Sequence, residues 1–315
     1  MPPRKSNMTK VFIDGSAGTT GLRIRERLAN RADLELLSLP EELRKDPSAR
    51  ADALNSADVS FLCLPDTAAH EAASWVTSPS AVIIDTSTAH RTAEGWTYGF
   101  PELKGRREKI ISSRRIANPD CHASGFIALI APLTESGLLS AGAQLSCFSL
   151  TGYSGGGKKM IAEYESDPLP DLYHAPRMYA LGQTHKHLPE MAALCGLCHP
   201  PVFCPIVGNF PAGMEVTVPL TRNEIAASPE EIRSLYREYY SSGLVRLNEA
   251  ADENGFLSAG ALAGRDDMEI SVFGNEERIL LVSRFDNLGK GASGAAIQNM
   301  NLVLGVDEAF GLVRG

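Results

Sequence analysis

The N-terminal part of the chain alternates short apolar runs with more polar, helix-forming stretches. Short apolar runs bounded by turn residues are typical of buried strands, and the stretches between them are typical of surface helices. Strands that alternate with helices are joined by right-handed crossovers and form a parallel, doubly wound sheet. We therefore predict an α/β region with strands at Lys10–Asp14, Leu34–Leu39, Val59–Leu64 and Ala81–Asp85 and helices at Leu22–Leu28, Ala49–Leu54 and Thr67–Val76.

After residue 135 the pattern changes to longer strand-like runs. This part contains a hairpin signal at Gly274–Glu277. It also contains a capping box at Ser228–Glu231, which predicts a helix to about Tyr240. The pattern predicts a second, α+β domain with a mostly antiparallel sheet. Its predicted strands are Gln144–Leu150, Glu215–Leu220, Met268–Phe273 and Arg278–Phe285. A final small-residue helix, Gly291–Leu304, is expected to return to the first domain.

Length and charge narrow the functional classes. A chain of 315 residues is long for one hydrophobic core, which favours two domains. The net charge of −8 and the pI near 5.5 argue against nucleic acid or an anionic membrane as a partner. Met1–Asn7 has the character of a loose tail rather than a signal peptide, and no apolar stretch approaches the roughly twenty residues that cross a bilayer. We expect a cytoplasmic protein.

Cys121 is the first candidate for chemistry. It lies in Asn118–His122, between a strand-like run, Lys109–Ala117, and an apolar helical run, Ala123–Leu133. A thiol at a helix start faces unpaired backbone N–H groups, which favour the nucleophilic thiolate. The alternative is a buried structural cysteine, which is the usual state of a free thiol.

A glycine turn follows the first predicted strand. Gly15, Gly18 and Gly21 are spaced so that the backbone can approach a pyrophosphate, and the next helix supplies N–H donors. The spacing departs from G-x-G-x-x-G, and an ordinary glycine turn is the alternative. The position between a strand and a helix favours nucleotide binding.

The end of the second strand indicates which nucleotide. NAD enzymes usually place an acid there for the ribose 2′-hydroxyl, but this chain has Leu37–Pro40, followed by Arg44 and Lys45. A 2′-phosphate is therefore tolerated or attracted, which favours NADP. The alternative is that the two cations belong to a solvated helix face.

His185–Glu190 is the second candidate for chemistry. Two histidines and a carboxylate can supply the general acid or base that a thiol enzyme needs. A metal-binding pair or plain surface histidines are the alternatives. No third ligand stands at a standard spacing, which argues against a metal.

Two further motifs imitate known sites. Gly152–Lys159 nearly matches a P-loop, but Lys159 stands where Mg²⁺ coordination needs Ser or Thr. This segment is either an anion nest or a flexible loop. Cys195, Cys198 and Cys204 suggest haem or zinc, but their spacing favours apolar packing and loop positions.

Taken together, these motifs make the chain resemble the N-acetyl-γ-glutamyl-phosphate reductases, in their shorter form, and more distantly the aspartate-semialdehyde dehydrogenases. The resemblance extends over nearly the whole chain. It is carried by GSAGTTG at 15–21, DTSTAHR at 85–91, YGFPEL at 98–103, NPDCHASG at 118–125, GYSGGGK at 152–158, HKHLPE at 185–190, KGA at 290–292 and QNMNL at 298–302.

The resemblance implies a two-domain, NADPH-dependent oxidoreductase of arginine biosynthesis, assembled as a dimer or tetramer. Residues 1–120 and 289–315 would form the Rossmann-type NADP domain, and residues 121–288 the catalytic and oligomerisation domain. The enzyme would reduce N-acetyl-γ-glutamyl phosphate to the semialdehyde and phosphate through a cysteine thioester.

The resemblance also implies roles for single residues. Cys121 would be the nucleophile and His187 the acid or base. Arg91, Ser154, His185 and Glu190 would surround the substrate, and the cofactor would be held by Gly15, Ser16, Gly18, Thr19, Thr20, Gly21, Ser38, Arg44 and Gln298.

Two residues depart from the family pattern. The residue before the nucleophile is often Gly, but here it is Asp120, whose charge would raise the pKa of the thiol unless the carboxylate caps the helix. Ala295 stands where the family usually has Gln.

Three other functions stay open at this point. The first is a related dehydrogenase acting on another acyl phosphate. The second is a Cys-His hydrolase or acyltransferase without a nucleotide, and the third is a cofactor-binding regulatory protein that has lost catalysis.

Overall fold

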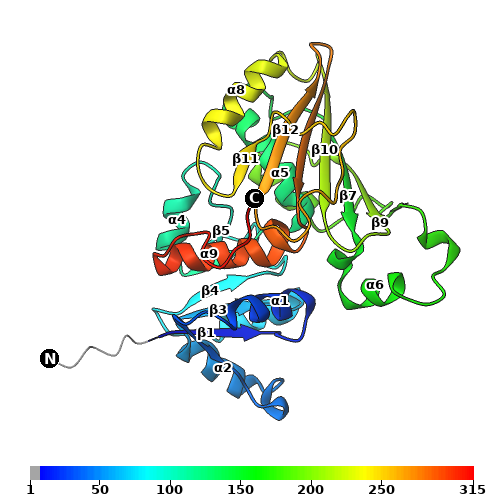
Figure 1. Ribbon diagram of the computed structural model, residues 1–315. Coiled ribbons are helices and arrows are strands. Elements are labelled where there is room, and N and C mark those ends of the chain that lie inside the picture. The colour runs from blue at the N-terminus through cyan, green and yellow to red at the C-terminus, as the bar shows by residue number, and fades with distance from the viewer. Residues whose placement is uncertain (1–7) are drawn as a thin grey trace.

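The computed structural model of the chain describes residues 8–315, so the predicted tail, Met1–Asn7, lies outside the described residues. Within them the strands form two sheets (Figure 1). The first has the order β2-β1-β3-β4-β6-β5, and all its neighbours are parallel. Its strands are β1 Thr9–Asp14, β2 Leu34–Leu37, β3 Val59–Leu62, β4 Val82–Asp85, β5 Thr97–Tyr98 and β6 Arg115–Ala117.

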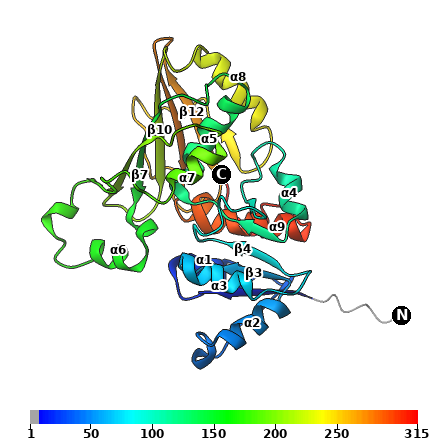
Figure 2. The same cartoon turned by 180° about the vertical axis from the view of Figure 1, so that it is seen from behind.

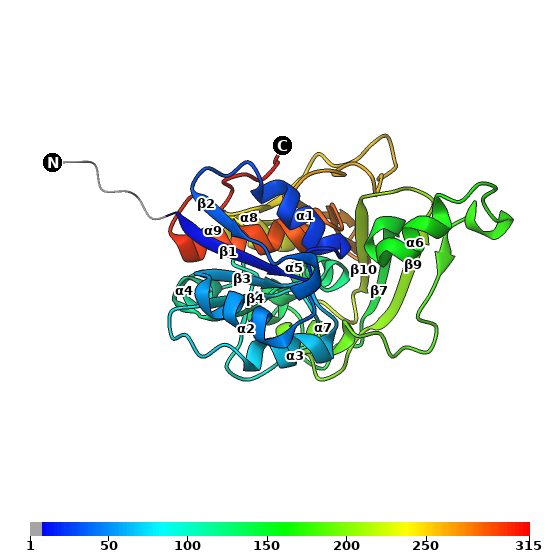
Figure 3. The same cartoon turned by 90° about the horizontal axis from the view of Figure 1, so that it is seen from below.

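Helices cover both faces of this parallel sheet because its strands alternate their buried side chains. Val11 and Ile13 pack with α1, α4 and α9, whereas Phe12 packs with α2 and α3 on the other face. Figure 3 views the molecule from the side of α2. The helices are α1 Thr19–Leu28, α2 Pro47–Ser56, α3 Asp66–Ser74, α4 Arg106–Ser112 and α9 Gly294–Leu304.

The second sheet is mixed and has the order β11-β12-β13-β10-β7-β9-β8. Its pairs are antiparallel except β7 with β9 and β11 with β12. The apolar helix α5, Cys121–Glu135, and α8, Pro229–Tyr239, pack against one face. The strands are β7 Ser146–Gly152, β8 Arg177–Met178, β9 Val202–Gly208, β10 Met214–Thr221, β11 Val245–Leu247, β12 Met268–Gly274 and β13 Arg278–Phe285.

Three further segments shape the region between the sheets. Helix α6, Gly157–Tyr164, belongs to a lobe that extends sideways from β7 (Figure 1), and α7, Leu188–Leu194, packs on α5 (Figure 2). A π-helical turn, Gly289–Ser293, leads into α9 and contacts α5. Helix α9, coloured red, lies between the first sheet and the second (Figure 1).

The predicted α/β class and the mostly antiparallel second sheet are confirmed. The strand-like run Lys109–Ala117 is wrong as a single strand, because α4 continues through Ser112 and only β6 is extended. Its residues Arg106–Lys109 are charged and exposed or half-buried, while Ile110 alone is buried from this helix. A surface helix with one buried residue has too little apolar periodicity to be recognised.

Within residues 8–315, no helix combines the length and the apolar character that crossing a membrane requires.

Candidate active site

The glycine turn joins β1 to α1 at the carboxyl edge of the parallel sheet. Gly15 has φ +85°, and a Cβ there would lie 2.3 Å from the carbonyl oxygen of Cys63. A Cβ on Gly21 would lie 2.5 Å from the carbonyl oxygen of Gly15. The close packing of the turn thus requires glycine at both positions. The helix that follows begins at Thr19, so its unpaired N–H groups face this edge.

A pocket of about 800 Å³ lies against the turn and the end of β2. The strand order reverses between β1 and β3, so the turn stands at the usual place for a ligand in an open parallel sheet, and the pocket extends from it toward β2. Ser38 and Arg44 line it, as predicted, but so do Glu41 and Glu42, which the sequence reasoning did not weigh. Four residues of the predicted cofactor set line the pocket: Gly15, Ser16, Ser38 and Arg44. Four others form the adjacent helix start: Gly18, Thr19, Thr20 and Gly21.

These features fit a dinucleotide. Ala17 and Gly18 of the turn are exposed, next to the helix start where a pyrophosphate can bind, and the pocket offers hydroxyl, acidic and basic side chains. Asp14, at the end of β1, pairs with Arg50 at 2.9 Å, so the guanidinium of Arg50 neutralises the Asp14 carboxylate beside the turn.

Cys121 is the first residue of α5. The preceding Asp120 is the N-cap, and its Oδ1 accepts a hydrogen bond from the Cys121 N–H at 2.9 Å. The π-helical turn crosses close by, since a Cβ on Gly291 would lie 2.8 Å from the Cβ of Cys121. Burial, and then the charge of Asp120, raise the pKa of the Cys121 thiol well above its usual value. Capping and a raised thiol pKa therefore coexist, and the thiol needs a base.

A buried ionic network surrounds Asp120. Arg91 donates to the Asp120 carboxylate at 3.1 Å and to Glu190 at 3.1 Å, and Tyr98 donates to Glu190 at 2.6 Å. Burial raises the pKa of Asp120, but the charges of His187 and Arg91 outweigh it and hold that pKa well below its usual range. Arg91 and Glu190 are therefore engaged with protein groups, and the structure does not leave Arg91 open to an anion.

Three histidines gather next to this network. His187 is buried, its Nε2 lies 2.8 Å from Asp120 Oδ2, and its Nδ1 has no hydrogen-bond partner. His185 lies with its ring 4.5 Å from that of His187, and burial lowers its pKa to about 4. The centroid of the His122 ring lies 5.5 Å from that of His187 and 5.7 Å from that of His185.

His122 differs from the other two because both its nitrogens are engaged. Nδ1 lies 2.6 Å from Ser149 Oγ and Nε2 lies 2.6 Å from Tyr179 Oη. Burial, and then the neighbouring His187, lower the pKa of His122 well below its usual value. His122 is thus a neutral, fixed ring, whereas His187 keeps an open nitrogen.

The glycine-rich segment connects this cluster with the nucleotide side. Ser154 is buried and accepts a hydrogen bond from Asn287 at 3.0 Å. A Cβ on Gly157 would lie 3.8 Å from Thr19 Oγ1, at the start of α1. The segment, interpreted from sequence as either an anion nest or a flexible loop, thus lies against the start of α1.

Gln298 lies elsewhere. It is fully buried in α9, and its amide contacts Lys290, Glu102 and Glu308 at 2.5 to 2.8 Å. Lys290 is itself buried and contacts both oxygens of Glu102 at 2.8 Å. The structure does not bring Gln298 to the nucleotide pocket; it places it in a polar core beneath the π-helical turn.

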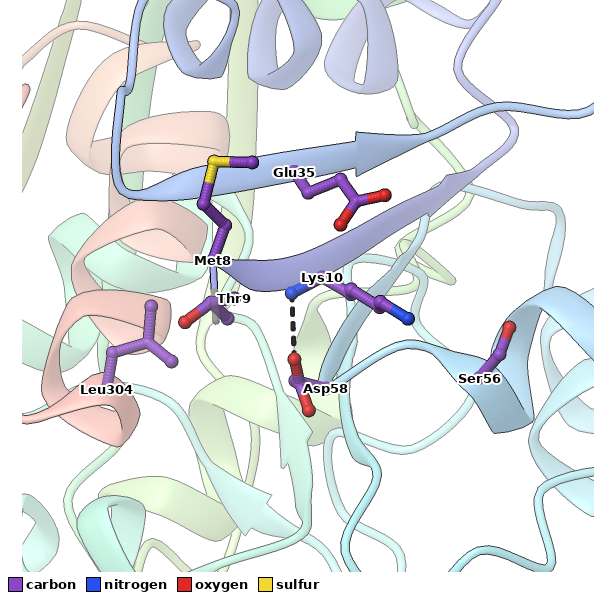
Figure 4. A pocket seen from close by; sticks show the side chains of 7 residues that line it. All are labelled: Met8, Thr9, Lys10, Glu35, Ser56, Asp58 and Leu304. Carbon is purple, nitrogen blue, oxygen red and sulfur yellow. Dashed lines mark hydrogen bonds between the residues drawn. The ribbon is translucent and has the colours of Figure 1, made fainter. Parts of the chain in front are cut away.

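Within the described residues, no group of three or more His, Cys, Asp or Glu side chains is arranged to hold a metal ion. Of the loop cysteines, Cys195 is buried and Cys198 is exposed. A second pocket, of about 580 Å³, lies at the amino ends of β1 and β3, where Lys10 donates its N–H to Asp58 (Figure 4). It is at the opposite edge of the sheet from the glycine turn.

Comparison with known proteins identifies the family of this chain. Two family models match the chain. "Semialdehyde dehydrogenase, NAD binding domain" matches residues 37–112, and "Semialdehyde dehydrogenase, dimerisation domain" matches residues 121–287. The N-acetyl-gamma-glutamyl-phosphate reductases of Brucella suis and Brucella abortus are 48% identical over 307 residues, covering 94% of this chain and 99% of each relative. The chain belongs to the N-acetyl-γ-glutamyl-phosphate reductase family.

Solved structures support the fold of this reductase family member. Aspartate semialdehyde dehydrogenase II from Vibrio cholerae has a TM-score of 0.70 at 16% identity, covering 94% of this chain and 98% of its own. The NADP complex of the Candida albicans enzyme has a TM-score of 0.67 at 15% identity, covering 95% and 99%. At such identities the likeness establishes the fold.

Sequence reasoning missed several residues of the reductase site. Tyr98 contacts Glu190 and Asn287 contacts Ser154, while Tyr179 contacts His122, and the chain order reveals none of these pairs. His122 was visible beside Cys121, and a polar ring next to a nucleophile was the one available signal.

Proposed function

We propose that this chain catalyses the NADPH-dependent reduction of N-acetyl-γ-glutamyl phosphate to N-acetyl-glutamate semialdehyde and phosphate. Family membership at 48% identity over 94% of the chain is the observation that carries the reaction and places it in arginine biosynthesis. The strand, glycine turn, helix and pocket support the nucleotide, and a semialdehyde dehydrogenase fold supports the chemistry.

We assign the covalent step to Cys121. Its sulfur attacks the acyl carbon, the bond to phosphate breaks, and the thiol proton passes to His187, whose Nδ1 is the open acceptor. His187 then returns the proton toward the departing phosphate. The result is a thioester on Cys121, with the backbone N–H groups at the start of α5 next to the reacting carbonyl.

When bound, NADPH supplies the hydride that reduces the thioester. The tetrahedral oxyanion collapses, the carbon–sulfur bond breaks, and the semialdehyde leaves. His187, which has given its proton to the phosphate, takes up a proton from solvent and passes it to the released thiolate, which restores the starting state. A sulfur nucleophile suits both halves, because a thioester accepts hydride and a thiolate is a good leaving group.

The remaining residues have proposed roles around these steps. Ser154 and His185 lie on the segments that border the cluster and are assigned to the substrate. Arg91 would reach an anionic group of the substrate only if its pair with Glu190 opened, and Glu190 is assigned to the surroundings of the substrate. The turn residues and Arg44 are assigned to the nucleotide; Gln298 is reassigned from the cofactor to the polar core that supports the π-helical turn.

We also propose the division into a nucleotide domain, 1–120 with 289–315, and a catalytic domain, 121–288. The packing of α9 against the first sheet supports it, because Ile297 and Met300 belong to the same apolar cluster as Val11. Association into a dimer or tetramer is a further prediction, in line with the matching dimerisation-domain description, and light scattering of the purified protein tests it.

The reverse reaction tests the function. The protein is supplied with N-acetyl-glutamate semialdehyde, NADP⁺ and phosphate, and NADPH formation is followed by absorbance, with aspartate semialdehyde as the parallel substrate. Phosphate-dependent reduction of NADP⁺ with the acetylated aldehyde is expected. Activity confined to aspartate semialdehyde would retain the chemistry and reject the substrate.

A further inference from the structure

Asp120 makes more contacts with the catalytic cluster than a helix cap requires. Its Oδ1 accepts from the Cys121 N–H, which is the capping contact. Its Oδ2 contacts two other groups, His187 Nε2 at 2.8 Å and Arg91 at 3.1 Å. One carboxylate thus joins the residue that carries the thiol to the residue that carries the open imidazole nitrogen.

The contact fixes which nitrogen of His187 carries a proton. An ionised carboxylate only accepts hydrogen bonds, so the nitrogen that faces it must be the N–H. For neutral His187 this places the proton on Nε2 and the lone pair on Nδ1. Nδ1 is buried and has no hydrogen-bond partner, so its lone pair is the one base that this ring can offer.

We infer that Asp120 is a positioning residue that holds His187 in the Nε2–H tautomer and so presents Nδ1 as the base for Cys121. This inference rests on the proposed function of His187. In a nucleophile–histidine–carboxylate arrangement the carboxylate orients the histidine, and Asp120 has this role here. Related chains often have Gly at this position, directly before the nucleophile. Asp120 touches no reacting atom; it acts through His187.

Several charged and titratable groups face this pair. From the loop after β4, Arg91 contacts Asp120, and from α7, Glu190 contacts Arg91. Lys186 lies 3.8 Å from the carboxylate and is mostly exposed. The other neighbours are His122, Cys121, His185, Tyr98, Tyr179 and, through its interaction with Arg91 and Lys186, Asp66.

The position of Asp120 gives the direction of the pH effect. Its carboxylate lies 2.8 Å from His187 Nε2, so its negative charge favours the protonated ring. When this charge is removed, the neighbouring cations Arg91 and Lys186 remain, and protonation of His187 is disfavoured. The limb of the rate profile that reports His187 therefore moves to lower pH, by about one pH unit, when Asp120 is neutralised.

Substitution of Asp120 by Ser separates capping from positioning. Serine still caps a helix but has neither the charge nor the reach for His187. Asp120→Glu keeps the charge, and Asp46→Ser, at the exposed N-cap of α2, is the matched control for capping alone.

The tautomer is read by NMR of the histidine ring nitrogens in the full-length protein, with His187→Gln used to assign the signal. We expect the Nε2–H form in the unmodified protein and a mixture in Asp120→Ser. Turnover of Asp120→Ser should fall roughly tenfold to hundredfold, with an unchanged KM, a shifted pH profile, and partial recovery in Asp120→Glu. Asp46→Ser should leave the His187 tautomer, the turnover and the pH profile unchanged.

An Nδ1–H tautomer in the unmodified protein would overturn the inference even if Asp120→Ser did not fold. An unmoved tautomer and pH profile in a folded Asp120→Ser protein would also overturn it. The NMR measurement needs no substrate, so it is independent of the proposed function, whose own failure would appear as undiminished turnover in His187→Asn.

Discussion

The nucleotide side and the catalytic side of this molecule differ in what supplies the functional groups. At the glycine turn they are backbone N–H groups and accessible side chains such as Arg44, held by close packing of Gly15 against Cys63. Around Cys121 they are buried side chains already paired with one another, such as Arg91 with Glu190. The first site is encoded within one short segment, and the second depends on contacts between distant segments.

This difference predicts how each side responds to change. A backbone-built site should lose affinity gradually when one side chain is removed, because the remaining donors persist. A network of buried charges should respond steeply, because each lost partner leaves another charge unpaired. The following predictions test the contrast, in order of decreasing effect.

Cys121→Ser should abolish turnover, since a serine hydroxyl at this position has no thiolate to form the acyl intermediate. Nucleotide binding, measured by calorimetry or fluorescence, should persist because Cys121 does not line the nucleotide pocket. The exposed Cys198 offers a matched control, and Cys198→Ser should keep full turnover. Near wild-type turnover in Cys121→Ser would remove the proposed nucleophile.

Lys290→Met should destabilise the fold by about 3–5 kcal/mol, because it leaves the buried Glu102 carboxylate without its cation. Urea unfolding measures the effect. Lys159→Met is the control, since that lysine is exposed and lies 4.0 Å from Glu163, where an ion pair contributes about 0–1 kcal/mol. Equal midpoints for the two variants would contradict the proposed role of the polar core.

His187→Asn should lower turnover by roughly a hundredfold or more, as expected for loss of a general base. The steady-state rate as a function of pH is the measurement. His185→Asn is the companion variant, and its effect should be smaller because burial lowers the pKa of His185 to about 4, which leaves it neutral at pH 7. An unchanged pH profile in His187→Asn would transfer the role to His185.

Arg44→Ala should raise the KM for NADPH by about tenfold, the loss expected for one charge-assisted contact of about 1.5 kcal/mol. The KM for NADH should hardly change, because NADH has no 2′-phosphate. Lys45→Ala, which removes the adjacent cation of the same pocket, serves as a comparison. If the NADPH and NADH values rose together, Arg44 would not be reading the 2′-phosphate.

The same contrast explains how far the sequence leads. Strands β1, β3 and β4 and the glycine turn follow from local periodicity and from glycine spacing, so they were predictable. The ion pairs Arg91–Glu190 and Lys290–Glu102 join residues 99 and 188 positions apart, and no local pattern encodes them. Gln298 was therefore assigned to the cofactor, whereas it belongs to that buried core.

Asp120 shows the limit most clearly. Its place before Cys121 predicted a raised thiol pKa unless the carboxylate capped the helix, whereas the structure has both the cap and the raised pKa. Its second contact, with His187, crosses 67 positions and depends on how α7 docks against α5. Only the assembled fold indicates that one carboxylate serves both residues.

The central claim is that the reaction passes through a thioester on Cys121. The direct measurement mixes the protein with N-acetyl-glutamate semialdehyde and NADP⁺ without phosphate, follows NADPH, and examines the Cys121 peptide by mass spectrometry. A burst of NADPH equal to the protein concentration, with the acyl group on Cys121 and its release on adding phosphate, is the predicted result. Steady NADPH formation without phosphate, or an unmodified Cys121 after the burst, would contradict the account.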